Sequence, residues 1–460
     1  MLAALNLVAD GPVPDWTGIT ADSRHVRPGM LFAALTDQPA YVAQAVAAGA
    51  AAVLAGPGLV WPAGTPSRPR ITSAKPRRAL AQLAALNAGP PPATVIAITG
   101  TNGKTSTAEF LRQILGAHAA SIGTLGVITA QGVASAGDVA SAGGLTTPDP
   151  VALADTMASL ARDGVRAVAI EASSHGLDQH RLDGLTLAAA GFTNLTRDHL
   201  DYHGSEAAYR AAKLRLFTEL LPRGAPAVTM ADLDGDLRAL IGGHTVGIGG
   251  SLIRLISSTP HAGGQTLVLD GRTIELPLPG RFQVDNALLA AGLAMVTGVH
   301  DALDRLPALR GVRGRMELAA TIRGAAVYVD YAHTPDALTR LLQSLRPHTK
   351  GRLQIVFGAG GDRDRGKRPL MGAAARLADL AIVTDDNPRT EDPAAIRAAV
   401  LAGNPGAREI GDRATAIAAA IDDLRPGDVL VVAGKGHEQG QAVGRAVIPF
   451  DDVSVVRMHA

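Results

Sequence analysis

The central part of the chain alternates short apolar runs with longer segments of helical periodicity. Residues 94–98 form an apolar run typical of a buried strand, and residues 105–115 carry apolar positions at helical spacing. Residues 165–171 and 187–192 are two further runs of strand length. Buried strands separated by helices are typical of parallel sheets, because parallel neighbours need crossover connections. The pattern therefore predicts a parallel α/β sheet in this part of the chain.

The same alternation returns in the last third of the chain, where helical segments separate four strand patterns, at 326–331, 353–357, 380–384 and 429–433. The N-terminal part predicts a smaller unit, with a strand at 31–35, an alanine-rich helix and a strand at 51–54. Residues 87–92, which include three prolines, and the glycine- and arginine-rich residues 309–315 mark two boundaries. We expect an α/β protein of three domains: a small N-terminal domain (1–91), a central parallel-sheet domain (92–310) and a Rossmann-like C-terminal domain (311–460).

Composition narrows the functions that the chain can perform. The formal net charge of its 460 residues is +1 without long runs of one sign, which disfavours nucleic acid or a membrane surface as a partner. There is no cysteine, which excludes disulfides, thiolate metal sites and cysteine nucleophiles. Residues 1–16 lack the pattern of a secretion signal, and the apolar window 39–57 is mostly alanine and is broken by Gln44 and Gly49. We expect a cytoplasmic protein without membrane insertion.

A glycine-rich turn joins the first central strand to the helix that follows it, with the sequence Thr-Gly-Thr-Asn-Gly-Lys-Thr from Thr99. The backbone N–H groups of such a turn form a nest for phosphate at the positive end of the helix dipole. Lys104 would reach the terminal phosphates of a nucleotide, and the Thr105 hydroxyl would take one position on Mg²⁺. The usual pattern has a glycine where this chain has Ile98, so the loop is a shortened variant. An ordinary glycine turn would not require this order of strand, Gly-Lys-Thr and helix. We predict a phosphate loop that comprises Gly100, Thr101, Asn102, Gly103, Lys104, Thr105 and Ser106.

Polar clusters follow several predicted strands at their carboxyl ends, where open α/β sheets bind ligands. Glu171 ends one strand and His175 follows it, while His199 lies in the polar segment after the next strand. Mg²⁺ prefers oxygen ligands, commonly one carboxylate plus phosphates, so these three residues are candidates for the metal shell. The alternatives are a structural glutamate and solvent-facing histidines. Residues 211–217 by themselves predict only a helix with a basic, solvated face.

Taken together, the motifs of the chain resemble those of the Mur ligases, the ATP-dependent amide-forming enzymes of peptidoglycan precursor synthesis. The similarity is greatest to the branch that adds a diamino acid to UDP-N-acetylmuramoyl-L-alanyl-D-glutamate. It spans nearly the whole chain and rests on D-S-R at Asp22, T-G-T-N-G-K-T at Thr99, T-T-P-D at Thr146, E-A-S-S-H-G-L at Glu171, N-L-T-R-D-H-L-D-Y-H at Asn194, K-L-R-L-F at Lys213, D-Y-A-H-T-P at Asp330, G-G-D-R-D-R-G-K-R-P at Gly360, D-N-P-R at Asp386 and G-K-G-H-E at Gly434. The resemblance implies a role in cell wall biogenesis, and through it in cell shape and cell division.

The resemblance also implies roles for individual residues. The catalytic set would be Lys104, Glu171, His199 and Lys213, and the Mg²⁺ ligands would be Thr105, Glu171, His199 and Lys213. Lys213 matches a carbamylated lysine, whose anionic oxygens would attract a metal that an ammonium repels. The nucleotide would be held further by Asn286, Arg315 and Asp330, and the UDP-substrate by Ser23, Thr146, Thr147, Ser173, Gln179 and Arg181. The loop after Leu35 is shorter than in the family, so Ser23 is the one uridine contact that we expect.

The acceptor amino acid would bind in a pocket near the C-terminus, formed by Arg363, Asp386, Asn387, Pro388, Arg389, Gly434 and Glu438. The D-N-P-R form resembles the meso-diaminopimelate branch of the family. The planar fork of the Arg389 side chain suits a carboxylate that lysine and ornithine lack at that end. One arginine does not settle the substrate, so ornithine and lysine stay open as acceptors.

The implied reaction is the phosphorylation of a substrate carboxylate by ATP, followed by attack of an amine on the acyl phosphate, with release of ADP and phosphate. We expect the C-terminal domain to close and exclude water, and we expect a monomer that acts on small molecules. One alternative is a folate polyglutamate-type ligase, which the Asp22 and Asp386 motifs disfavour. Another is a P-loop switch or binding module that hydrolyses nucleotide without joining substrates.

Overall fold

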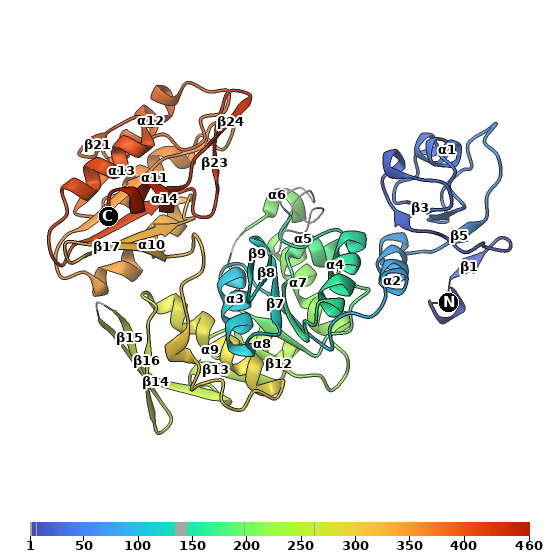
Figure 1. Cartoon of the computed structure of the whole chain (residues 1–460), viewed down its shortest axis with the longest axis horizontal. Coiled ribbons are helices and arrows are strands. Elements are labelled where there is room, and N and C mark those ends of the chain that lie inside the picture. The colour runs from blue at the N-terminus through green and yellow to red at the C-terminus, as the bar shows by residue number, and fades with distance from the viewer. Residues whose placement is uncertain (1, 6, 134–144, 197, 262) are drawn as a thin grey trace. The chain divides into compact units, whose positions relative to one another are not determined.

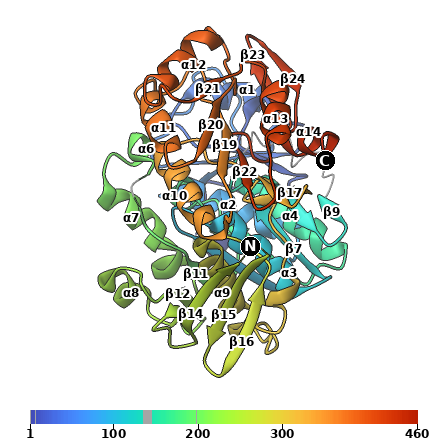
Figure 2. The same cartoon turned by 90° about the vertical axis from the view of Figure 1, so that its left-hand side faces the viewer.

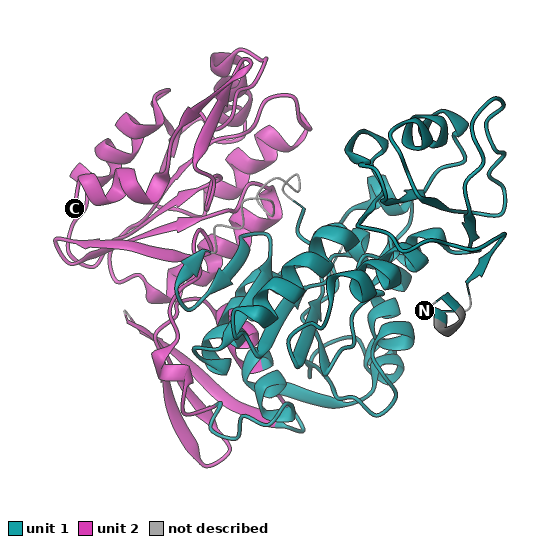
Figure 3. Ribbon diagram, turned by 45° about the vertical axis from the view of Figure 1, so that its right-hand side comes forward, with its two compact units in different colours: residues 1–246, 250–252, 289–302 teal, residues 247–249, 253–288, 303–460 magenta. Residues whose placement is uncertain are grey.

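The computed structural model describes residues 2–5, 7–133, 145–196, 198–261 and 263–460. Arg197, in the motif that begins at Asn194, lies outside the described residues. The chain divides into two compact units, which Figure 3 colours separately. Unit 1 comprises residues 1–246, 250–252 and 289–302, and unit 2 comprises residues 247–249, 253–288 and 303–460. The three-domain boundaries at 91 and 310 stay a prediction.

Unit 1 begins with a small five-stranded sheet, shown in blue in Figure 1. Its strand order is β1 (Val8–Ala9), β5 (Arg70–Thr72), β4 (Ala52–Ala55), β3 (Leu31–Ala34) and β2 (Ile19–Thr20), and only the β1–β5 pair is antiparallel. Alternate residues of β3 point to opposite faces, as in any strand. Helix α2 (Pro76–Ala88) packs against Leu31 and Ala33, whereas α1 (Pro39–Ala47) packs against Phe32 and Ala34. The predicted helix and strand after residue 39 are confirmed.

The larger sheet of unit 1 carries the phosphate loop. The order of its strands is β13 (His244–Ile248), β12 (Ala227–Met230), β11 (Ala189–Phe192), β6 (Thr94–Thr99), β10 (Ala167–Glu171), β7 (Ala119–Gly123), β8 (Gly126–Thr129) and β9 (Gly132–Val133). The strands from β13 to β7 are parallel, as the buried apolar runs predicted. Beyond β7 the sheet continues as an antiparallel meander. Strand β6 therefore lies between β10 and β11, and the polar ends of all three strands share one edge.

Helices cover this sheet and connect its strands (Figure 1). They are α3 (Lys104–Leu115), α4 (Pro150–Arg162), α5 (Ser174–Asp178), α6 (Leu200–His203), α7 (Glu206–Arg215), α8 (Gly235–Ile241) and the C-terminal part of α9 (Arg281–Val296). One continuous core joins Val95 and Ala97 of β6 to Met157 of α4 and to Leu216. Leu216 begins a five-residue π-helical segment, Leu216–Leu220, directly after α7. The predicted helix around residue 213 is thus confirmed, although it ends in a wider turn.

Unit 2 is built on a six-stranded sheet with helices on both faces. Its order is β17 (Glu317–Ile322), β18 (Ala325–Asp330), β22 (Val429–Ala433), β19 (Leu353–Phe357), β20 (Leu380–Val383) and β21 (Arg408–Glu409), and only β17 is antiparallel to its neighbour. One face is covered by α10 (Pro335–Leu345), α11 (Lys367–Ala375) and α12 (Pro393–Leu401). The other is covered by α13 (Arg413–Asp422) and α14 (Asp452–Met458). All four predicted strands are present, and the predicted α/β class is confirmed.

Unit 2 also contains antiparallel structure that the apolar runs did not indicate. Strands β14 (Ile253–His261), β15 (Gly264–Leu269) and β16 (Arg272–Leu276) form a meander and lie side by side in Figure 2. A hairpin of β23 (Gly440–Val443) and β24 (Ala446–Pro449) precedes α14. Most residues of β14 are exposed and several are polar, and all four residues of β24 are exposed, so neither strand is the buried apolar run of a parallel sheet.

Candidate active site

The phosphate loop follows β6 and ends at Gly103, which caps α3 with a left-handed backbone (φ +87°). The Lys104 ammonium donates hydrogen bonds to the carbonyl oxygens of Gly100 (3.0 Å) and Thr101 (2.8 Å), so it lies over the loop itself. A Cβ at Gly100, whose φ is +139°, would collide with the Thr193 hydroxyl. The loop thus has the strand–turn–helix geometry of a phosphate nest.

Residues after β11 hold the loop in shape. The Thr101 amide donates to the Asn194 carbonyl (2.8 Å), and the Asn102 amide donates to the Asn194 side chain (3.0 Å). The Thr193 hydroxyl donates to the Asn102 carbonyl (2.6 Å). Neither Thr193 nor Asn194 was predicted as a site residue, although both adjoin the polar cluster that follows this strand. Their contacts are long-range pairings that only the fold reveals.

Lys213 lies directly beneath the loop and is 1% exposed. Its Nζ donates to the Gly100 carbonyl (2.7 Å) and sits 4.5 Å from the centroid of the Tyr209 ring. Burial, together with the like charge of Lys104, lowers the pKa of the Lys213 ammonium to about 6. A neutral amine is the form that can add CO₂, so the environment favours the predicted carbamate. The prediction from residues 211–217 alone, a helix whose basic face is solvated, is wrong at Lys213.

Glu171 ends β10 beside the first turn of α3 and is 2% exposed. One carboxylate oxygen accepts from the Thr105 hydroxyl (3.0 Å), and the other accepts from the Thr124 amide (2.8 Å). The side chain fits because β7 ends in Gly123, where any Cβ would collide with the carboxylate. Thr124 follows that glycine in no recognised motif and was therefore missed. Two of the four predicted metal ligands, Thr105 and Glu171, are in contact.

His199 lies farther along the same edge, with a left-handed backbone (φ +49°) and a half-exposed side chain. Its ring packs at 4.8 Å from that of His175 and at 6.2 Å from that of Tyr209. None of its contacts among the described residues is with Thr105, Glu171 or Lys213. Across the described part of the chain, no group of three or more His, Asp or Glu side chains is arranged to hold a metal ion.

Four of the six residues predicted to bind the UDP-substrate form a continuous hydrogen-bonded series, namely Thr147, Ser173, Gln179 and Arg181. The Thr147 hydroxyl donates to the backbone carbonyl of Glu171 (2.7 Å) and lies 3.0 Å from the hydroxyl of Ser173, which caps α5. Arg181 donates to the Thr147 carbonyl (2.6 Å) and to the Gln179 side chain (2.8 Å). The hydroxyl of Thr146 is 3.2 Å from that of Thr124. Thr147 is therefore bonded to the backbone of Glu171, and Thr146 lies next to Thr124, which binds the Glu171 carboxylate.

Gln179 and Arg181 open onto a cavity of about 1350 Å³ within unit 1. Its walls also include His25, Arg77 and Asp149. The predicted uridine contact, Ser23, is 7% exposed and donates to the Gln44 side chain (2.8 Å), and it does not line the cavity. Cavities of this size accommodate extended ligands rather than single ions.

In unit 2, two of the three predicted nucleotide residues, Asp330 and Arg315, lie near the end of β18. The Asp330 carboxylate accepts from the backbone amides of Met316 (2.7 Å) and Ala332 (2.8 Å). The Arg315 guanidinium lies 4.6 Å from the centroid of the Tyr331 ring. Asn286, 5% exposed, donates to the Gln283 side chain (3.2 Å).

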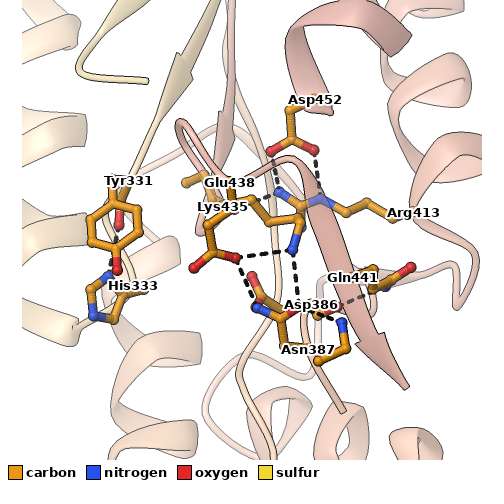
Figure 4. A network of polar contacts seen from close by, with 11 residues as sticks. Tyr331, His333, Asp386, Asn387, Arg413, Lys435, Glu438, Gln441 and Asp452 are labelled. Atoms are coloured by element: carbon orange, nitrogen blue, oxygen red, sulfur yellow. Dashed lines mark hydrogen bonds and ion pairs between the residues drawn. The ribbon is translucent and has the colours of Figure 1, made fainter. Parts of the chain in front are cut away.

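The predicted acceptor residues lie at the ends of β20 and β22, and Figure 4 shows their polar network. The Asn387 amide donates to Glu438 Oε2 (2.9 Å), and its own oxygen accepts from the backbone amide of Ala442 (2.9 Å). Asp386 is 8% exposed, and its buried Oδ2 atom accepts no hydrogen bond from the residues that the structure describes. Gly434 (φ +117°) leaves room for this oxygen, with which any Cβ would clash. The fully buried Arg413 next to Asp386 pairs with Asp452 instead.

Arg389 has a left-handed backbone (φ +52°) that the hairpin of β23 and β24 holds in place. Its amide donates to the Ala442 carbonyl (3.0 Å), and its guanidinium donates to the Gly361 carbonyl (2.7 Å). A Cβ at Gly361 would collide with the Pro388 carbonyl, so this glycine lets the two loops meet. Within the described parts of the chain, the Arg363 side chain makes no hydrogen bond or ion pair. The predicted acceptor residues thus come together from three loops of one sheet edge.

The chain matches two protein-family descriptions. Residues 98–294 match the Mur ligase middle domain, and residues 314–436 match the Mur ligase, glutamate ligase domain. A protein of Caulobacter vibrioides named UDP-N-acetylmuramoyl-L-alanyl-D-glutamate--2,6-diaminopimelate ligase is 54% identical over 463 residues, covering 96% of this chain and 94% of the relative. The protein of the same name from Rhizobium meliloti is 50% identical over 478 residues, covering 98% and 95%.

A solved structure described as that of a UDP-N-acetylmuramoyl-L-alanyl-D-glutamate--2,6-diaminopimelate ligase has the same fold. Its TM-score is 0.71 at 33% sequence identity, with 98% of this chain and 96% of that chain covered. Within the described residues, no helix combines the length and the apolar character needed to cross a membrane.

Proposed function

The chain belongs to the Mur ligase family, and on that premise we propose that it adds meso-diaminopimelate to UDP-N-acetylmuramoyl-L-alanyl-D-glutamate with hydrolysis of ATP to ADP and phosphate. The observation that carries this proposal is the identity of about half of all residues, over nearly the full length, to ligases of that name. We further propose that the protein works in the cytoplasm as a monomer. Through its part in cell wall biogenesis it would support cell division.

In this mechanism the backbone N–H groups at the start of α3 and the Lys104 ammonium would bind the phosphates of ATP. They offset the charge that develops as the substrate carboxylate attacks the γ-phosphate. Asp330, Arg315 and Asn286 would hold the rest of the nucleotide. Thr147, Ser173, Gln179 and Arg181, together with Thr146 and Ser23, would orient the UDP-substrate so that its carboxylate faces the phosphate.

The oxygen donors beside the loop suit Mg²⁺, because the Thr105 hydroxyl and the Glu171 carboxylate are already in contact. Lys213 as a carbamate and His199 would complete the protein's share of its shell. When bound, Mg²⁺ would neutralise negative charge on the phosphate oxygens.

The amine then attacks the acyl phosphate, and phosphate leaves. Arg389 would hold the distal carboxylate of diaminopimelate through two hydrogen bonds. Asp386 and Glu438 would accept hydrogen bonds from ammonium groups, with Asn387, Arg363, Pro388 and Gly434 shaping the pocket. Ligation needs both units, since the phosphate loop lies in unit 1 and the acceptor residues lie in unit 2. A chain that ends at residue 310 yet keeps full ligase activity would contradict this division of labour.

The test is phosphate release in the presence of ATP and the UDP-substrate, with diaminopimelate, lysine and ornithine as separate acceptors. We expect release and a ligated product with diaminopimelate only. The variant Arg389→Ala should raise the KM for diaminopimelate by about 10- to 100-fold, since charge-assisted hydrogen bonds are lost. Arg389→Lys keeps the positive charge but lacks the planar fork of the guanidinium. Its KM for diaminopimelate should lie between the values of wild type and Arg389→Ala. Equal turnover with lysine or ornithine would overturn the assignment of the acceptor.

A further inference from the structure

Lys435 lies directly after β22, one residue beyond Gly434, and its side chain is 0% exposed. Lysine is almost never fully buried without a partner. Instead of extending to solvent, the side chain reaches the loop after β20 and the next turn of its own loop, as Figure 4 shows.

The Lys435 ammonium closes a ring of three hydrogen bonds with two acceptor-pocket residues. Its Nζ donates to Asn387 Oδ1 (3.0 Å) and to Glu438 Oε2 (3.1 Å), and Asn387 Nδ2 donates to the same Glu438 oxygen (2.9 Å). An ammonium can only donate, so it fixes which end of the Asn387 amide carries the oxygen. The Ala442 amide, which donates to the same oxygen, agrees with that assignment.

The ring leaves one Glu438 oxygen available. Oε2 accepts two hydrogen bonds, whereas Oε1 accepts none from the described residues, and the side chain is 35% exposed. The buried Asp386 carboxylate nearby also has an oxygen, Oδ2, that is hydrogen-bonded to none of the described residues. Both carboxylate oxygens could accept a hydrogen bond from a cationic group bound in the acceptor pocket. Among the described residues, Arg413 forms its ion pair with Asp452, and Glu438 forms its ion pair with Lys435.

We propose that Lys435 is a positioning residue for the incoming amino acid. It holds Asn387 and Glu438 in one orientation, so that Glu438 Oε1 accepts a hydrogen bond from an ammonium group of the acceptor. It also offsets part of the negative charge that the two carboxylates bring to a buried site. This inference rests on the proposed function, and it assigns a role in substrate affinity to a residue that does not touch the substrate.

The test compares Lys435→Met with wild type in the phosphate-release assay, varying diaminopimelate, ATP and the UDP-substrate in turn. We expect the KM for diaminopimelate to rise by about tenfold or more, the equivalent of one lost charged hydrogen bond. The KM values for ATP and the UDP-substrate should change by less than about twofold. Lys435→Gln, which keeps one donor group, should give an intermediate KM for diaminopimelate. This variant replaces Lys435→Met in the test if Lys435→Met does not fold. Lys350→Met, at an exposed lysine of the same unit, should match wild type.

A double-mutant cycle with Glu438→Gln separates positioning from a general effect on structure. If Lys435 acts through Glu438, the double variant should be no worse than Glu438→Gln alone, within about twofold. Independent, multiplying losses would overturn the proposal, and so would an unchanged KM for diaminopimelate in a folded variant. Equal rises in all three KM values would show a structural role and would also overturn it. Absence of diaminopimelate-dependent release in wild type would instead refute the proposed function.

Discussion

Two buried lysines, one in each unit, have opposite surroundings. Lys213 donates to a backbone carbonyl, packs on the Tyr209 ring and lies near the like charge of Lys104, and burial lowers its pKa to about 6. Lys435 donates to the carboxylate of Glu438 and to an amide oxygen. The difference teaches that burial alone does not decide what a lysine does. Surroundings without a carboxylate partner lower the pKa of the Lys213 ammonium, whereas the hydrogen bonds of Lys435 orient Asn387 and Glu438.

The largest expected effect comes from the removal of Lys213. Lys213→Met should lower kcat for phosphate release by at least about 100-fold, because a group beside the developing phosphoryl charge is lost. Lys350→Met is the surface control, and a melting curve checks the fold. In ¹³CO₂-enriched buffer, a carbamate carbon signal should be present in wild type and absent in Lys213→Met, but retained in Lys435→Met. A kcat within twofold of wild type would remove Lys213 from the catalytic set.

The next effect concerns the glycines that make room for a carboxylate in each region. Gly123→Ala would drive a methyl group into Glu171, and Gly434→Ala would do the same to Asp386. Each should cost about 1–3 kcal/mol of unfolding free energy. Gly434→Ala should cost more, since φ is +117° there and alanine is strained as well as crowded. Denaturant unfolding of both variants measures the costs, with Gly298→Ala, at positive φ in open space, as the strain-only control.

The same two variants should change different kinetic constants. Gly123→Ala should lower kcat, because the displaced Glu171 loses its contact with Thr105, and Gly434→Ala should raise the KM for diaminopimelate. If both variants changed the same kinetic constant alone, the assignment of Glu171 to the phosphoryl step and Asp386 to the acceptor would be wrong.

Sequence reasoning was most successful where chemistry and local structure coincide. The phosphate loop was predicted because strand, glycine turn and helix are contiguous, so neighbouring residues determine its geometry. Lys213 was harder, since its helix is basic by itself and only tertiary packing puts Gly100 and Tyr209 against it. Its predicted role came from the family resemblance.

Other parts of the site were beyond prediction for a physical reason. Thr124 contacts Glu171 across 47 positions of the chain, and nothing in its local sequence marks it. Lys435 stands within a motif that was identified, yet its burial and its bonds to Asn387 depend on two loops that meet only in the folded sheet. The meander of β14–β16 was missed because half-exposed antiparallel strands lack long apolar runs.

The last effect, and the one most specific to the comparison, is the pH dependence of stability. Between pH about 6 and the ordinary lysine value of 10.5, the unfolded chain holds a proton on Lys213 that the folded chain lacks. The free energy of unfolding should therefore rise with pH in this window, by up to about 1.4 kcal/mol per pH unit from this residue. A carbamate on Lys213 would leave the sign unchanged, because it too lacks the ammonium proton. Urea unfolding of unit 1 at pH 6.5, 7.5 and 8.5 should show this contribution in wild type and in Lys435→Met, and its loss in Lys213→Met. Identical slopes in wild type and Lys213→Met would mean that Lys213 stays protonated when buried, and the contrast between the two lysines would fail.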